Sequence, residues 1–147
     1  MAVAKEALKH ILGEIPFTAE LYYLVRQNGR PIQSRFSLKH LQTAMPELVE
    51  QATELRRTAK LGKKVAMFST LHYWIEHAAL LGLALAAQGH QVSFGFLPYA
   101  EWQSQINKFD LRRQNAYAKR VLSMASPLID STSLLSIRTS SPRSKVI

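Results

Sequence analysis

Three side chains that can bind or transform a polar substrate lie close together in the middle of the chain. Ser69 and Thr70 can donate hydrogen bonds to a phosphate or a sugar, and His72 can act as a general base because imidazole titrates near neutral pH. Ser69–Trp74 contains no glycine, so it is neither a GxGxxG nor a Walker A phosphate-binding loop. We take Ser69 and Thr70 as candidate substrate-binding residues and His72 as the candidate catalytic residue, with a purely structural His72 as the alternative.

A second group of candidate ligands is basic. Arg112 and Arg113 recur seven residues later as Lys119 and Arg120, so the four side chains form a stripe along a helix predicted over 111–125. Guanidinium groups suit phosphate, and we take Arg112 and Arg113 as candidate substrate-binding residues. The alternative is that this stripe is an ordinary solvated helix surface.

The histidines near residue 75 do not predict a metal site. His72, Glu76 and His77 lack the His-Glu-x-x-His spacing of zinc hydrolases, and no third ligand follows. We expect His77 to be a polar anchor in a packed helix, and Tyr73 and Trp74 to be core or loop anchors, with an aromatic stacking platform as the alternative. The sequence therefore predicts no metal and no cofactor.

The elements that must position Ser69, Thr70 and His72 form a strand–helix–strand unit. Val65–Phe68 is a short apolar run that predicts a buried strand, and Gln91–Leu97 predicts another. The helix predicted between them, Ile75–Gln88, is apolar on nearly every side, which is typical of a helix covered on two sides. Such a crossover implies parallel strands, and ligands bind outside the carboxyl ends of parallel strands.

The remaining chain suggests three regions. Residues 1–62 predict a helical segment in which one helix runs from Thr18 to Asn28, and Pro46 breaks one helix and begins the next. Residues 63–128 form the α/β unit. Residues 129–147 are rich in serine, threonine and arginine, which predicts a disordered tail; a reading frame lost near residue 130 is a second explanation.

Composition and charge limit the class of protein. The chain has 147 residues, of which 47% are hydrophobic and 20% charged, so it is typical of a globular domain. Its net charge of +9 favours anionic partners, and it has no cysteine for disulfides or thiol chemistry. The longest apolar run, Ala78–Ala87, is too short to span a membrane, and no secretory signal precedes it, so we expect a cytoplasmic protein.

The segment Lys64–Leu97 resembles the opening βαβ unit of GT-B glycosyltransferases. The matching residues are the strand Val65–Phe68 and the run Leu81–Phe94, in which a Leu-Ala-rich helix ends in Gly-His-x-Val before the second strand. The resemblance implies a nucleotide-sugar or glycan-acceptor substrate, with His72 as the base. In that family the donor binds mainly in a later domain, so the resemblance implies the acceptor-side half of such an enzyme.

Two hypotheses of function follow. The first is a partial GT-B-type protein for surface polysaccharide synthesis, inactive alone. The second is a non-enzymatic basic module that binds nucleic acid or an acidic protein through the helix at 111–125. For the fold we expect an α/β protein with a helical N-terminal layer followed by a Rossmann-like βαβ unit and a small parallel sheet. Two strands make an incomplete domain, so truncation or association with another chain is expected.

Overall fold

The computed structural model describes residues 2–27, 30, 35–101, 103 and 105–137. Its centre is a three-stranded sheet of order β1-β2-β3 in which both pairings are parallel. The strands are β1 Lys64–Thr70, β2 Gln91–Leu97 and β3 Ile129–Ser133. The α/β architecture and the parallel βαβ unit expected from the sequence are confirmed.

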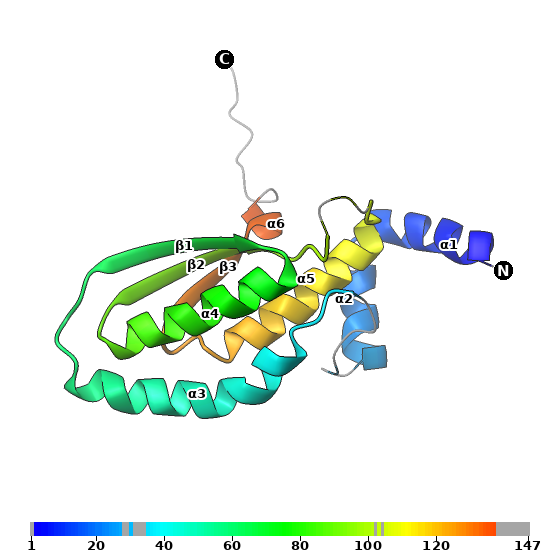
Figure 1. The fold of residues 1–147 in the computed structure, drawn as a ribbon. Helices are drawn as coiled ribbons and strands as arrows, with labels where there is room; N and C mark the ends of the chain where they lie inside the picture. The colour runs from blue at the N-terminus through cyan, green and yellow to red at the C-terminus, as the bar shows by residue number, and fades with distance from the viewer. Residues whose placement is uncertain (1, 28–29, 31–34, 102, 104, 138–147) are drawn as a thin grey trace, which may run out of the picture.

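Two crossover helices join the strands on one face of the sheet. Helix α4 (His72–Ala87) connects β1 to β2, and α5 (Lys108–Ser123) connects β2 to β3 (Figure 1). Helix α3 (Lys39–Thr58) packs on the side of α4 away from the sheet and also contacts α5. Phe94 and Phe96 of β2 point toward these helices and are almost completely buried. The apolar core therefore lies between the sheet and the three helices.

The N-terminal helices pack on α5. They are α1 (Ala2–Glu14), α2 (Thr18–Tyr22) and the π-helical turn η1 (Tyr23–Gln27). The predicted helical N-terminal region is present, but the helix expected over Thr18–Asn28 continues past Tyr22 as a π-helix. Asn28 lies outside the described residues.

Pro46 does not break a helix as predicted, because α3 runs continuously from Lys39 to Thr58. Proline inside a helix removes a hydrogen bond and costs roughly 3 kcal/mol. Leu41, Met45 and Ala52 are buried on one side of α3, within the core that also holds the inner side of α4. The free energy gained by burying these side chains offsets the lost hydrogen bond. Helix propensities of individual residues do not include this tertiary contribution, so the sequence did not predict the continuous helix.

The prediction of a disordered tail is wrong for residues 129–137. Ile129 is 3% exposed and packs near Gly82 of α4, and the Ser133 hydroxyl donates to Oδ1 of Asn115 at 2.5 Å. The backbone of β3 pairs in register with β2, and the short helix α6 (Leu134–Ile137) follows. The backbone pairing, which composition does not reveal, is what orders this polar segment. Residues 138–147 lie outside the described part of the chain.

The sheet face opposite α4 and α5 is covered differently. Gly95 points to this face, where a Cβ would lie 3.7 Å from both Leu134 of α6 and Phe68 of β1. Phe68 nevertheless remains 59% exposed. Helix α6 therefore covers the middle of this face and leaves the β1 side open.

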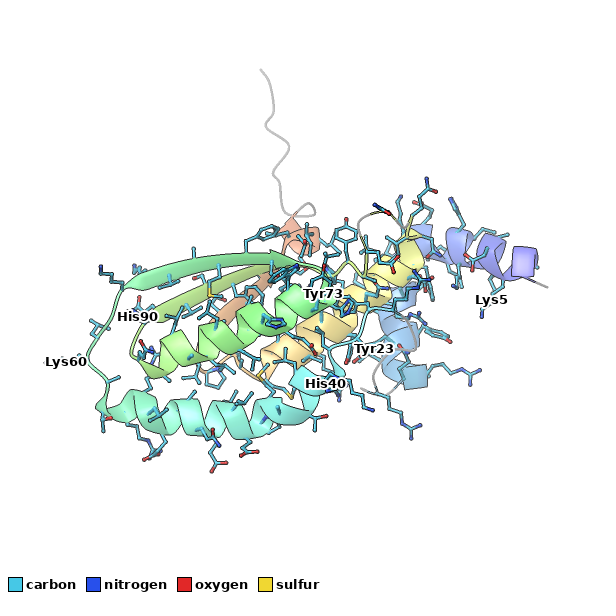
Figure 2. The ribbon with its side chains drawn as sticks, viewed as in Figure 1. Lys5, Tyr23, His40, Lys60, Tyr73 and His90 are labelled. Carbon is cyan, nitrogen blue, oxygen red and sulfur yellow. The ribbon has the colours of Figure 1, made fainter. Side chains whose placement is uncertain are left out.

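The loop before β1 is hydrogen-bonded to the turn between α4 and β2, where Lys60 and His90 mark the two segments in Figure 2. The Gly62 amide donates to the Gly89 carbonyl at 3.0 Å, and the Lys63 amide donates to Nδ1 of His90 at 2.9 Å. Gly89 has a positive φ of 92°, and a Cβ there would lie 2.1 Å from the Lys60 carbonyl oxygen. Only glycine fits this position without backbone movement.

We expect Gly89→Ala to lower the free energy of unfolding by about 3 kcal/mol or more, because strain and the overlap with Lys60 add. Gly95→Ala is the matched control, since its new methyl group meets only ordinary van der Waals contacts. Urea unfolding followed by circular dichroism measures both. Equal stability of the two variants would contradict this reading of the turn.

Candidate functional site

A pocket lies where the carboxyl end of β1 meets the first turns of α4, close to Tyr73 in Figure 2. Its volume is about 610 Å³. It is lined by Met67–Thr70 of β1 and by Trp74, His77, Ala78 and Leu81 of α4. This is the edge at which parallel sheets bind ligands.

Ser69 and Thr70, both predicted from the sequence, lie in this pocket. Ser69 is 7% exposed, and its hydroxyl donates to the Thr70 carbonyl at 3.3 Å. Thr70 is half-buried, so its hydroxyl can meet a ligand at the pocket wall. The pair can supply two neutral hydrogen-bonding groups.

The turn between Thr70 and α4 contains a strained residue. Leu71 has φ 64° and ψ 139°, a conformation that favours glycine, although its side chain is 4% exposed. Strain of this kind costs of order 1–3 kcal/mol and persists only when the surroundings impose it. Nucleotide-binding loops place glycine at the turn after the first strand, so this turn differs from them in sequence.

His72 does not line the pocket. Its ring makes edge contacts with Phe36 at 6.2 Å and Tyr73 at 5.2 Å between centroids. Its Nδ1 is buried without a hydrogen-bond partner among the described residues. The structure therefore brings Ser69 and Thr70 together, but directs His72 toward the segment before α3.

His77 occupies the position in the pocket that we expected of His72. Its Nδ1 lies 2.6 Å from the Tyr73 carbonyl oxygen, which can only accept, so Nδ1 donates and Nε2 remains the acceptor of the neutral ring. The expectation that Tyr73 and Trp74 are core or loop anchors is wrong, because both are exposed on α4, Trp74 by 56%. His77, expected as a polar anchor in a packed helix, is exposed and bonds to the Tyr73 carbonyl of its own helix. The spacing of Trp74, His77 and Leu81 places them on one side of a helix, a signal that was available in the sequence.

Arg112 is directed into the protein. It forms two hydrogen bonds with the Glu20 carboxylate, at 3.1 and 2.5 Å, and donates to the carbonyl oxygens of Gly13 and Ile15 at 3.0 and 2.7 Å. These contacts hold the end of α1 and the start of α2 against α5. The residue predicted to bind substrate thus contributes to packing of the N-terminal helices.

The other basic side chains of α5 divide between interior and surface. Arg113 is 15% exposed and pairs with Asp110 at 3.1 Å. Lys119 is exposed and donates to the Ser136 hydroxyl at 2.5 Å, and Arg120 is exposed as well. Three of the four basic side chains in the predicted stripe, those of Arg112, Arg113 and Lys119, therefore make contacts within the chain.

The pocket between β1 and α4 has neutral polar groups and an aromatic face. No lysine or arginine is among the described residues that line it. Within the described ranges, no three histidine, aspartate or glutamate side chains are grouped to hold a metal ion, and no helix is long and apolar enough to cross a membrane. The pocket between β1 and α4 offers a ligand the hydroxyls of Ser69 and Thr70, the acceptor Nε2 of His77 and the aromatic ring of Trp74.

Comparison with known protein families, with curated proteins and with solved structures finds no match to this chain. The chemistry of the pocket must therefore be inferred from its own side chains.

We expect Arg112→Ala to lower the free energy of unfolding by about 2 kcal/mol, because it leaves the Glu20 carboxylate and two carbonyl groups without their charged donor. Arg120→Ala removes an equal charge from the surface of the same helix and should change stability by less than about 0.5 kcal/mol. Chemical unfolding of both variants checks this. If the two losses are alike, Arg112 does not hold the N-terminal helices.

The same contact predicts a dependence on pH. Burial opposes ionisation of Glu20, but hydrogen bonds from Arg112 and the backbone outweigh it and lower the pKa below its ordinary value of 4.5. A lowered folded pKa stabilises the protein above 4.5, and this contribution is lost as the pH falls through the folded pKa. Glu20→Gln should thus reduce stability at pH 7 by roughly 1 kcal/mol, and the difference should shrink toward pH 3.

Urea unfolding at both pH values measures this difference. Glu54→Gln is the control, because the Glu54–Arg57 pair is about 70% exposed on both sides and contributes little. A Glu20→Gln effect that is the same at both pH values would contradict the assignment.

Proposed function

We propose that the pocket between β1 and α4 binds the sugar part of a substrate, and that this chain is the acceptor-side half of a GT-B-type glycosyltransferase. The observation that carries the proposal is the exposed indole of Trp74 beside the hydroxyl-bearing Ser69 and Thr70, at the carboxyl end of a parallel strand. A sugar presents an apolar C–H face that stacks on an aromatic ring and hydroxyls that hydrogen-bond to neutral polar groups. Both kinds of contact are available in this pocket.

The proposed roles follow from the positions of the side chains. Trp74 stacks on the sugar ring, and Ser69 and Thr70 orient its hydroxyls. In glycosyl transfer a base removes the proton of the acceptor hydroxyl as its oxygen bonds to C1 of the donor sugar. The bond from C1 to the donor's nucleoside diphosphate breaks, and the diphosphate leaves with the electron pair. His77 has a free Nε2 at the pocket, which supports it as this base more than His72, the residue implied by the family resemblance.

The basic-module hypothesis has less support. It requires a charged surface on α5, but Arg112 and Arg113 are engaged with Glu20 and Asp110. Lys119 and Arg120 alone make a weak patch for nucleic acid, whose affinity depends on several phosphate contacts.

We expect glucose, as a representative acceptor sugar, to bind with saturation in ligand-observed NMR titrations. Trp74→Ala should weaken this binding by about tenfold or more, equivalent to roughly 1.4 kcal/mol, because the stacking face is lost. His77→Gln should weaken binding less. His40→Gln is its control, because His40 is an exposed histidine on α3, outside the residues lining the pocket.

A range of hexoses and their nucleotide conjugates extends the test. Absence of saturable binding by every one of them, or binding that Trp74→Ala leaves unchanged, would refute the proposed function.

A further inference from the structure

Strand β1 is an open edge of the sheet, and apolar side chains surround it. Sheet order places β2 on one side of β1 and no described strand on the other. Beside this edge, Phe68 is 59% exposed and Leu81 of α4 is 55% exposed. Long apolar edge strands readily pair with another strand, and proteins normally protect them.

The hydrogen bonds of β1 show which peptide groups are available. The Gln91 amide donates to the Lys63 carbonyl at 3.0 Å, so residue 63 faces β2. The N–H and C=O groups of successive residues point alternately to the two sides of a strand, so those of residues 65, 67 and 69 also point to β2. The open side of β1 therefore carries the N–H and C=O groups of Lys64, Ala66, Phe68 and Thr70.

The side of α4 next to this edge is uncharged over its whole length. Its exposed residues recur at helical spacing: Tyr73, Trp74, His77, Leu80, Leu81, Ala84 and Gln88. Helix α4 packs against the sheet on one side and against α3 on another, so these exposed residues form its uncovered side. The open strand edge and the open helix side are adjacent, as the pocket they share shows.

The sequence of β1 is complementary to itself in the antiparallel direction. When two copies pair about Met67, the middle residue, each Ala66 lies opposite Phe68 and each Lys64 opposite Thr70. These are the outward-facing residues, so they form the hydrogen-bonded pairs of an antiparallel ladder. No like charges meet, whereas a parallel in-register pair would place Lys64 beside its own copy.

The other edge is less suited to pairing. Strand β3 spans only five residues and carries the exposed Asp130, and short edges with charged residues resist association.

We propose that two copies of this chain pair antiparallel through β1 about Met67, forming one six-stranded sheet. The pairing does not rest on the proposed function. It covers Trp74 and Leu81 of the pocket, so each copy binds either a sugar or its partner at this surface.

The available surface is large enough for such a pair. The exposed parts of Phe68, Tyr73, Trp74, Leu80 and Leu81 amount to roughly 500 Å² on each copy, judged from typical side-chain areas. Two copies together reach about 1,000 Å² before the strand backbones are included, which is the lower limit of a specific interface.

Analytical ultracentrifugation of the full chain at about 100 µM tests the pairing, and we expect twice the mass of one chain. Leu81→Glu should give monomers, because it places two carboxylates in the interface. Ala66→Pro should also give monomers, because it removes an outward-facing amide without affecting the β1–β2 ladder. Leu55→Glu is the matched control: Leu55 is 63% exposed on α3, so this variant should remain dimeric.

Circular dichroism confirms that each variant is folded before its mass is interpreted. A monomeric wild-type chain, or a folded Leu81→Glu variant that stays dimeric, would overturn the proposal.

Sugar binding by a monomeric variant separates this proposal from the proposed function. Ala66 is not among the residues lining the pocket, so a folded, monomeric Ala66→Pro variant should bind glucose. If the wild type is dimeric but this variant does not bind glucose, the proposed function fails and the pairing through β1 stands.

Discussion

The predominantly apolar helix α4 is the element on which the packing of the sheet depends. It connects the two longer strands in a parallel arrangement, and its buried residues Ile75, Ala79, Leu83 and Ala86 belong to the common core with the strands and α3. Small residues let the sheet approach closely: a Cβ at Gly82 would lie 3.0 Å from Ile129 of β3. Placement of β1, β2 and β3 thus follows from burial of one helix.

The same helix also determines where the fold is incomplete. Parallel sheets are normally covered on both faces and continue on both sides of an apolar strand. Here one side of α4 and one edge of β1 remain exposed next to each other. The pocket lies in this exposed region, so ligand binding and association between chains involve neighbouring parts of one surface. This proximity is why the proposed dimer bears on the proposed substrate site.

Charge has two separate roles in the chain. Arg112 stabilises the contact between α5 and the N-terminal region, because its guanidinium satisfies the Glu20 carboxylate and carbonyl oxygens there. Arg113 pairs with Asp110 within α5. Many of the remaining cations lie on the surface and account for the basic character of the chain. The net charge of the chain therefore does not indicate which ligand it binds. The pocket at the end of β1, which has neutral polar and aromatic side chains, is the better guide to the ligand's chemistry.

The sequence by itself determined the βαβ unit, because strand and helix periodicities and the Gly89-His90 turn are local signals. It also placed Ser69 and Thr70 at the carboxyl end of β1. Tertiary structure decided the rest. Packing of α3 against the core keeps this helix continuous across Pro46, and backbone pairing with β2 makes the polar segment at 129–133 a strand. Tertiary structure also exchanged the positions expected for His72 and His77, because side-chain direction depends on where a helix begins and what packs beside it, which spacing alone does not fix.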